Sequence, residues 1–551
     1  MSQPVLDINP SELNDVESLK AALNQTLNFI NTLCEQNQQL LKQNQELKDE
    51  INRLKGEKGK PKILGCTRKI SDISSERYTQ EKKKWEKKSK KQFIKIDNKV
   101  DCPVEREKLP HDAIFKGYDK VISQDIIFKR NNTEYKVELW YSPSQKKTYR
   151  CPLPNTYTGY FGNNLKAFCI TMHYAMDITR NKLLSLLSSM GIEMSDGSLQ
   201  NILTENSDMW IREKNDLLKA GMNGQYIQAD STGARVRGQN QYTHVFTSDF
   251  FSVFSTLPGK SRLNILSALQ GQPAEGINLQ YNQTSIELLK HFKIPPRYCK
   301  RIKQIFKAKE IIRLKEFESN SLDVVLQELR GKKTLYRWVV ESLALGYYFT
   351  QTHYPAPGIL VSDDAGEYEM LADYRMLCWI HDARYYNKLT PFTKYHREEL
   401  ENFKQKYWKF YEHLKQYKQN PSLEFKTRIE ENFDKIFNPN TSYFNLNKEI
   451  QRTLSNKKHL LTLLDFPFIP LHNNASELAA RRQVRKRDIC LHTMTDLGTK
   501  LQDAFMSIIH TSFLLGIDAY GYILNRVNNN PDFYLPDLVI NRINISKHTN
   551  Y

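Results

Sequence analysis

The longest regular pattern of hydrophobic and polar positions in the chain is a heptad near its N-terminus. Across residues 16–54, apolar side chains recur at spacings of three and four, with leucine at most d positions. Asn37 and Asn44 occupy a positions, where an amide pairs with its counterpart on a second helix and fixes the register. The pattern predicts a parallel dimeric coiled coil. The alternative is one long amphipathic helix that folds back on its own chain.

Strand-like patterns occur in three later places. Residues 125–150 alternate apolar and polar around two turns, which predicts a small antiparallel meander. Residues 224–256 contain the runs "GQYIQAD", "YTHVFTS" and "FFSVFST", and the first is predicted to end at Asp230. A shorter apolar run, "ILVSDD", ends on Asp363 and Asp364. Together with the helical segments around them, these runs predict an α/β fold.

Helical periodicity covers most of the remaining chain. Residues 178–203 hold two apolar helices separated at Gly191, with Ser195 or Ser198 as the cap of the second. This is the layout of a helix-turn-helix, although plain packing of two helices in a helical domain gives the same pattern. Two further stretches have apolar residues at helical spacing. One is a segment of about a hundred residues that follows the run "FFSVFST", and the other is a second block over 393–468.

These patterns divide the chain into predicted segments. Asp230 and Asp363 fall in the first part of the predicted core, and Glu477 falls in the last segment. The segments are a disordered N-terminus (1–15), a coiled coil (16–55), a basic linker (56–100), a small β-meander (101–155), a helical region with the helix-turn-helix layout (156–222), the first part of the core (223–392) with a helical insertion at about 265–350, a second helical insertion (393–468), and the helix of Glu477 with C-terminal helices (469–551).

The excess of basic over acidic residues indicates which kind of partner the protein binds. Eighty Lys and Arg against 62 Asp and Glu give a formal net charge of +18, which favours nucleic acid before an anionic membrane. The lysine run "EKKKWEKKSKK" is suited to sequence-independent phosphate contact, although a solvated linker explains it equally well. No signal sequence is visible, and the most apolar late stretch is interrupted by His510 and Asp518. We expect a soluble cytoplasmic protein without a membrane segment.

The eight cysteines are widely spaced and form no C-x-x-C pair, which argues against a disulfide framework. Cys102 and Cys151 flank the predicted meander. Two thiols cannot complete a tetrahedral zinc site, so a structural zinc requires two further ligands. Buried free thiols are the simpler expectation.

Three acidic residues stand at positions that suit catalysis. Asp230 and Asp363 are predicted at strand ends, and Glu477 lies in the first turn of a helix. Three carboxylates at one edge of a sheet repel one another unless divalent cations intervene, and two Mg²⁺ ions roughly 4 Å apart satisfy such a site. The alternatives are local: a capping box from Asn474 to Glu477, an i,i+4 pair between Glu477 and Arg481, and aspartates that simply end strands.

Four stretches in a fixed order carry a resemblance to a known family. They are "QADSTGARV", "GILVSDDAGEYEML", "CWIHDAR" and "NNASELAARRQVRKRDIC", followed by a helical tail. They resemble the catalytic core of DDE-type bacterial insertion-sequence transposases, in particular the sixty-six family. The resemblance implies a ribonuclease-H-like (retroviral-integrase-like) core with helical insertions, preceded by the coiled coil and a helical DNA-binding region. It also implies an Asp-Asp-Glu triad that binds two Mg²⁺ or Mn²⁺ ions.

The resemblance assigns roles to residues by position. The triad becomes Asp230, Asp363 and Glu477, and Asp364 is left as a turn residue because neighbouring strand side chains face opposite ways. The family's clustered zinc-ribbon cysteines are reduced here to Cys102 and Cys151, and the Cys378–His381 pair of "CWIHDAR" is too small a ligand set, so the sequence does not complete a zinc site and these residues are interpreted as structural. The residues predicted to contact DNA are Lys260, Arg262, His381, Arg384, Arg481, Arg482, Arg485, Lys486 and Arg487.

The prediction for function is a bacterial DNA transposase. It would bind the terminal inverted repeats of an insertion sequence as a homodimer, possess nuclease and strand-transfer activity, associate with the nucleoid, and act with any accessory proteins of the element. Two alternatives stay open: a catalytically inactive, domesticated DNA-binding relative that acts as a repressor, and a Mg²⁺-dependent nuclease on the same fold. The insertion before Asp363 is longer than the family's usual spacing, and its role is open.

Overall fold

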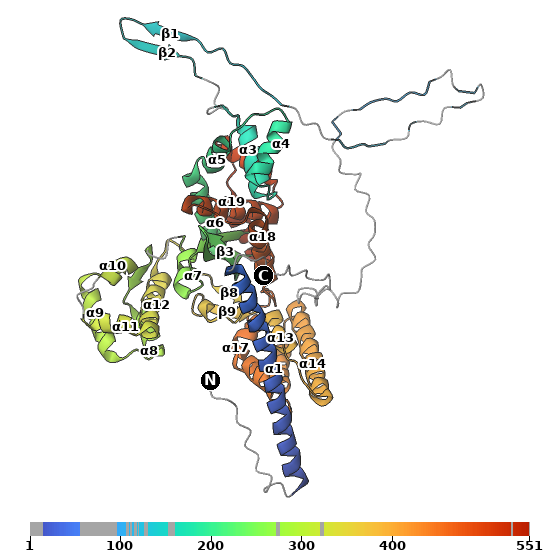
Figure 1. The fold of residues 1–551 in the computed structure, drawn as a ribbon, viewed down its shortest axis with the longest axis vertical. Helices are drawn as coiled ribbons and strands as arrows, with labels where there is room; N and C mark the ends of the chain where they lie inside the picture. Colours follow the sequence, from blue (N-terminus) through green and yellow to red (C-terminus); the bar gives the residue numbers. More distant parts are fainter. Residues whose placement is uncertain are drawn as a thin grey trace. The chain divides into compact units, whose positions relative to one another are not determined.

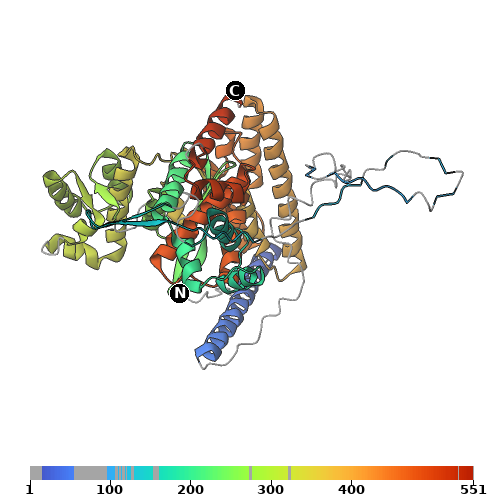
Figure 2. The same ribbon diagram turned by 90° about the horizontal axis from the view of Figure 1, so that it is seen from above.

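The computed structural model describes residues 15–54, most of 96–152, and 160–549 apart from three short gaps at 272–275, 320–323 and 531–532 (Figures 1 and 2). The chain forms two compact units. The small unit comprises Arg68–Pro152 and Ser185–Met194, and the large unit comprises the rest. The predictions for the N-terminus and for most of the basic linker, including its lysine run, lie outside the described residues.

The small unit contains a single β-hairpin where the sequence predicts a meander. Strand β1 (Leu139–Ser142) pairs with β2 (Lys147–Arg150), and the described residues before β1 form no strand. The side chains of both strands are almost all exposed, including Trp140 and Tyr149, which lie opposite one another, and no third strand covers them within the described residues. Cys102 and Cys151 are free and exposed, which corrects the expectation of buried thiols.

The predicted heptad forms one continuous helix, α1 (Val16–Leu54). Its a and d side chains such as Leu23, Leu33 and Leu40 are exposed. The opposite face is hydrogen-bonded to the large unit: the amide of Asn31 bonds the ring Nδ1 of His396 at 3.0 Å, and Asn31 itself is fully buried. The helix is confirmed, and its pairing with a second copy stays a prediction.

A five-stranded mixed sheet forms the centre of the large unit, in the order β5-β4-β3-β8-β9. β3 (Ile227–Val236), β4 (Gln239–Thr247) and β5 (Ser252–Leu257) are antiparallel, whereas β8 (Ile359–Ser362) and β9 (Tyr374–Leu377) run parallel to β3. Asp230 lies within β3 and not at its end, which corrects the prediction. β3 pairs with β8 only at Ile227 and Gln228, whereas its antiparallel pairing with β4 runs from Gln228 to Val236.

Two C-terminal helices cover the antiparallel half of the sheet. α18 (Asn474–Cys490) packs on β3 and β4, and α19 (Asp496–Leu514) packs on β5 and on α6 (Ser207–Met222). Side chains of α19 at successive four-residue spacings accept hydrogen bonds from alternate backbone amides of the edge strand β5: Asp503 from Thr256 at 2.6 Å, Ser507 from Phe254 at 2.9 Å, and Thr511 from Ser252 at 3.1 Å. The outer edge of the sheet is therefore satisfied by helix side chains.

The first insertion, between β5 and β8, is mainly helical as predicted, but it also contains a two-stranded sheet that the sequence pattern did not indicate. β6 and β7 are only three residues each, too short for a periodic signal. Its elements are α7 (Arg262–Leu269), β6 (Asn278–Gln280), α8 (Gln283–His291), α9 (Pro296–Ala308), β7 (Ile311–Arg313), α10 (Leu314–Ser319), α11 (Val324–Gly331) and α12 (Lys333–Thr350).

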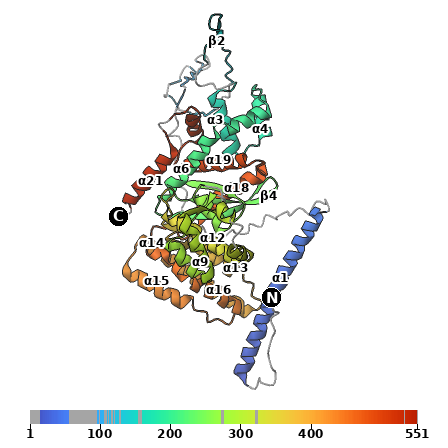
Figure 3. The same cartoon turned by 90° about the vertical axis from the view of Figure 1, so that its left-hand side faces the viewer.

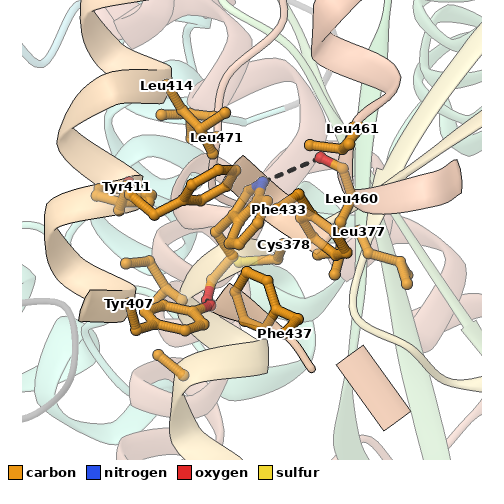
Figure 4. Close-up of a cluster of buried hydrophobic side chains, with 14 of the residues drawn as sticks. Leu377, Cys378, Tyr407, Tyr411, Leu414, Phe433, Phe437, Leu460, Leu461 and Leu471 are labelled. Atoms are coloured by element: carbon orange, nitrogen blue, oxygen red, sulfur yellow. Dashed lines mark hydrogen bonds between the residues drawn. The ribbon is translucent and has the colours of Figure 1, made fainter. Parts of the chain in front are cut away.

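The second helical block packs around Trp379, the first residue of α13 (Trp379–Asn387). Figure 3 shows the helices of this part of the chain, and Figure 4 shows its buried cluster, with Tyr407, Phe433 and Phe437 among the labelled side chains. The rings of Tyr407, Phe410 and Phe437 surround the indole, and its Nε1 donates to the carbonyl of Leu460 at 3.0 Å. This aromatic core fixes the start of α13. The helices are α14 (Lys394–Gln419), α15 (Leu423–Ile436), α16 (Phe444–Ser455) and α17 (Lys457–Leu460), followed by the 3₁₀ turn η7 (Thr462–Leu464).

The predicted helix pair is present as α4 (Arg180–Ser189) and α5 (Asp196–Thr204). Ser195 caps α5 by accepting from the amide of Ser198, and Gly191 has a φ of 74°, a left-handed conformation that favours glycine. Use of this pair as a helix-turn-helix stays a prediction. Within the described residues no helix is both long and apolar enough to span a membrane. The remaining helices are α3 (Asn163–Tyr174), α20 (Ala519–Val527) and α21 (Leu535–Thr549).

Candidate active site

Asp230 lies on β3, just beyond the point where that strand leaves β8. One carboxylate oxygen accepts a hydrogen bond from the amide of Ser231 at 2.7 Å. Burial raises the pKa of Asp230 to about 6, the Ser231 bond opposes this, and the negative charges of Asp363 and Glu477 raise it further. Lys260, which is exposed, lowers it. Three carboxylates from distant parts of the sequence therefore act electrostatically on one another.

Asp363 and Asp364 follow β8 and have different surroundings. The carboxylate of Asp364 accepts hydrogen bonds from Tyr385 at 2.8 Å and from Arg452 at 2.9 Å, so it belongs to the scaffold of α13 and α16. It does more than the simple turn residue that was predicted. The carboxylate of Asp363 accepts only a weak bond from the amide of Ala365, at 3.3 Å, among the bonds that the structure describes. Of the two side chains, that of Asp363 is the one left for other ligands.

Two buried arginines hold the loop after Asp363. Arg375 of β9 donates to the carbonyls of Asp363 at 2.8 Å and Ala365 at 2.9 Å. Arg262 donates to the carbonyls of Gly366 at 2.7 Å and Glu369 at 2.9 Å, and its Nη1 pairs with Glu341 of α12. Its side chain is 8% exposed. Arg262 was predicted to contact DNA, but in the structure its guanidinium is buried and fully used by the protein.

Residues of β3 position the N-terminus of α18. The side-chain oxygen of Gln228 accepts from the amides of Ala475 at 3.1 Å and Ser476 at 3.4 Å, which are orphan donors in the first turn of the helix. Asn473 donates to the carbonyl of Ala229 at 2.8 Å. These bonds tie the start of α18 to the two residues that precede Asp230, and so bring Glu477 to the same edge of the sheet.

The local alternatives for Glu477 are wrong in this structure. α18 begins at Asn474, the N-cap is Asn473, and no side chain of the helix makes a capping bond there. The Glu477 carboxylate is instead bonded to α13. Arg384 donates to its two oxygens at 3.1 and 3.3 Å, and Nε2 of His381 lies 3.4 Å away. Among the ion pairs of the described residues, none joins Glu477 to Arg481.

The motif "CWIHDAR" contributes side chains to two different faces of α13. His381 and Arg384, one turn apart, face Glu477, and burial together with the charge of Arg384 lowers the pKa of His381. Asp382 faces the helical block, where it bonds Arg452, Thr453 and Tyr407. Burial raises the pKa of Asp382 to about 6 despite these partners.

Cys378 precedes α13 and behaves as a core residue. Its sulfur accepts from the amide of Asn473 at 3.3 Å, and burial raises the pKa of the thiol to about 12. A thiol that holds its proton is a poor metal ligand, because metals bind the thiolate.

The basic residues of α18 differ in accessibility. Arg481, Arg482 and Arg485 are exposed, as predicted for DNA contacts. Lys486 is 1% exposed, donates to the carbonyl of His173 and lies 3.7 Å from Asp177. Arg487 is partly buried and donates to the carbonyl of Gly233. Lys486 therefore joins α18 to α3 and is closed to DNA in this structure.

The donor set suits a hard divalent cation in kind, because all three acids offer carboxylate oxygens. Within the described part of the chain, no three His, Cys, Asp or Glu side chains converge closely enough to hold a metal ion. The hydrogen bonds from Arg384 direct Glu477 toward α13, where Nε2 of His381 lies 3.4 Å from the carboxylate.

Comparison with known proteins gives two matches. The family described as "Transposase IS66 family" matches residues 337–501, a range that contains Asp363, "CWIHDAR" and Glu477. An uncharacterized protein of Sinorhizobium fredii (strain NBRC 101917 / NGR234), y4jO, is 30% identical over 319 residues. The matched region covers 56% of this chain and 94% of that relative.

Proposed function

The chain belongs to the IS66 family of transposases, and on this premise we propose that it cleaves DNA at the terminal inverted repeats of an insertion sequence and joins the freed ends to new DNA, with Asp230, Asp363 and Glu477 as the catalytic triad. The observation that carries the proposal is geometric: β3, which holds Asp230, pairs in parallel with β8 just before Asp363, and Gln228 of β3 accepts from the first-turn amides of the helix that holds Glu477. Asp363 and Glu477 are 133 and 247 positions from Asp230 in sequence.

The fold supports the proposal. Three antiparallel strands followed by two strands parallel to the first, in the order β5-β4-β3-β8-β9, are what we expect of a ribonuclease-H-like core. The acids lie on the central strand β3, directly after its parallel neighbour β8, and on a helix that Gln228 docks to β3. Such a scaffold holds side chains firmly while the surrounding loops stay open to substrate.

The chain's own residues suggest a division of labour. Mg²⁺ held by the three carboxylates would activate the attacking oxygen and stabilise the leaving one. Arg375 and Arg262 keep the Asp363 loop in place, and Arg384 and His381 hold Glu477 at the edge of the site. The exposed residues Lys260, Arg481, Arg482 and Arg485 would contact DNA phosphates, which position a strand without reading its sequence.

We assign dimerisation to α1. Its a and d leucines at 19, 23, 33, 40 and 47 are exposed, while Asn28, Asn31 and Glu35 on the opposite face bond residues of the helical block. The two surfaces do not compete, so a second copy can pair with the apolar face while the polar face stays bound. Two protomers joined in this way would hold two transposon ends together.

The test is strand cleavage and strand transfer with end-bearing DNA and Mg²⁺. Asp230→Asn and Glu477→Gln should each reduce both activities by a factor of about 10³ or more while DNA binding persists, because each change removes a ligand of the cations. The matched control is Asp488→Asn, an exposed acid on the same helix as Glu477. Full activity of Asp230→Asn would refute the proposal. Binding without nicking in the wild type would point to a repressor, and nicking without joining to a nuclease.

A further inference from the structure

The first insertion carries a long stretch of positive charge in the large unit. Residues 290–315 hold ten Lys or Arg and one acidic residue, Glu310. These residues contribute a formal +9, half of the chain's net +18. Such a density is typical of a surface that meets a polyanion, although a solvated face that keeps an insertion soluble is the ordinary alternative.

Helix α9 concentrates this charge on one face. Tyr298, Ile302 and Phe306 are buried, and they form the side that packs into the insertion. Lys300, Lys303 and Lys307 are exposed. At 3.6 residues per turn these three lysines fall within an arc of about 60° opposite the buried side, and they extend about 10 Å along the helix axis. We call these three residues the α9 lysine face.

The α9 lysine face has no acidic counterpart in the described structure. Neighbouring cations are neutralised within the insertion: Arg297 pairs with Glu328 at 2.5 Å and Lys309 with Glu316 at 2.7 Å. Among the residues that the structure describes, no acidic side chain forms an ion pair with Lys300, Lys303 or Lys307. The insertion thus neutralises the flanking cations and leaves three aligned ones for an external partner.

A chain of packed elements connects this face to the candidate active site. α9 packs on α11, and α11 packs on α12. Glu341 of α12 forms the buried ion pair with Arg262, which also bonds the carbonyls of Gly366 and Glu369 in the loop after Asp363. The insertion is therefore joined to the site through a buried and specific contact, and a ligand on α9 would have a defined relation to the carboxylates.

We propose that the α9 lysine face is a second DNA-binding surface, which contacts the phosphate backbone of duplex DNA outside the segment held at the carboxylates. This inference deepens the proposed function and rests on it for the identity of the polyanion. Three aligned ammonium groups over about 10 Å match consecutive phosphates along one strand, and they offer no base readout. The surface would hold duplex DNA that flanks the reacting strand.

The test compares two triple variants of the full-length protein. Lys300→Gln, Lys303→Gln and Lys307→Gln together remove the face, and Lys406→Gln, Lys409→Gln and Lys435→Gln on α14 and α15 remove the same charge from other exposed positions. Fluorescence anisotropy with labelled duplexes is measured across salt concentrations. The α9 variant should bind about 10- to 100-fold more weakly near 0.15 M salt, and its log–log salt slope should fall in magnitude by about 2 to 3, since each phosphate contact contributes about 0.9.

Two duplexes identify the source of the DNA. An equal loss on end-bearing and scrambled duplexes assigns the face to flanking or target DNA, and a loss confined to the end-bearing duplex assigns it to the transposon end; either result supports the proposal. A wild-type salt slope in the α9 variant, or an equal loss in the control variant, would overturn it. Thermal unfolding of both variants checks that the fold is retained.

Failure of this inference can be told apart from failure of the proposed function. Asp230→Asn tests chemistry on bound DNA, whereas the α9 variant tests binding. If Asp230→Asn were fully active and the α9 variant still lost affinity, only the triad would be wrong. If Asp230→Asn were inactive and the α9 variant bound normally, only the second surface would be wrong.

Discussion

The two helical insertions differ in whether their distinctive residues form a buried core or an exposed charged surface. The block of α14 to α17 builds an aromatic core around Trp379 and, through α13, fixes the partners of Glu477. The earlier insertion exposes a lysine face and meets the loop after Asp363 through Arg262, which pairs with Glu341 inside the insertion and donates to the carbonyls of Gly366 and Glu369. One insertion is therefore a scaffold whose loss should unfold the site. The other is an attached module whose surface can change without cost to the fold.

The largest expected effect is on the scaffold. Trp379→Ala should lower the free energy of unfolding by about 3–5 kcal/mol, because it empties the centre of the aromatic core and removes the bond to Leu460. Strand cleavage should be lost with it. Denaturant unfolding followed by circular dichroism measures the change. Leu423→Ala, at a position 81% exposed, is the control and should be near neutral. A near-neutral Trp379→Ala would remove the distinction between the insertions.

The next effect concerns the junction of the module. Glu341→Gln leaves the guanidinium of Arg262 buried without its countercharge, which should cost about 3 kcal/mol in the free energy of unfolding and loosen the loop after Asp363. Glu328→Gln breaks an exposed pair in the same insertion and should cost less than about 1 kcal/mol. Thermal unfolding and nicking assays compare the two. Equal costs would mean that the junction is no more important than the surface.

Between the two insertions, the helical block of α14 to α17 is the one in which we expect the free energy of unfolding to depend on pH. Because burial raises the pKa of Asp382 to about 6, the folded protein holds a proton there that the unfolded chain, with a pKa near 4, releases. Stability contributed by this group therefore decreases as pH rises from about 4 to 6, by about 1–3 kcal/mol. Asp382→Asn should flatten that dependence, as denaturant midpoints at pH 4 and 6.5 would reveal. An unchanged pH profile in the variant would contradict the assignment.

The smallest effect is on the stability of the α9 lysine face. Lys303→Gln should change the free energy of unfolding by less than about 0.5 kcal/mol, because the side chain is exposed and forms no ion pair with any described residue. Thermal unfolding is the measurement, and Lys409→Gln on α14 is the matched control. A clear loss of stability would indicate that the lysine face has a structural role inside the insertion.

Much of the fold follows from local periodicity, and the parts that fail are set by tertiary contacts. The strand "ILVSDD" and the long helix α1 were predicted because their patterns are complete within a few residues. The end of β3 was misplaced because β3 stays paired with β4 as far as Val236, after its short pairing with β8 has ended, and this leaves no mark in the sequence of β3 itself. β6 and β7 were missed because three residues carry no period.

In the candidate site, too, features set by the local sequence were predicted and features set by tertiary contacts were not. Strand alternation allowed only one of Asp363 and Asp364 to face the metals, and the resemblance selected Asp363. In the structure both residues follow β8, and Asp364 has other partners. The capping box at Glu477 failed because Gln228, 247 positions from Ala475, supplies the bonds that a local side chain would have made. Arg262 and Lys486 were taken for surface cations because a sequence does not reveal that a charged residue is buried with a partner.

The contacts of α19 with β5 have a consequence for assembly. An unpaired strand edge invites a neighbouring molecule to add its own strand, and a dimer through α1 would raise the local concentration of such edges. Asp503, Ser507 and Thr511 occupy alternate amide donors of β5, so an incoming strand would first have to displace α19. In such a dimer, α19 would protect the two sheets against exchanging strands or aggregating through their edges.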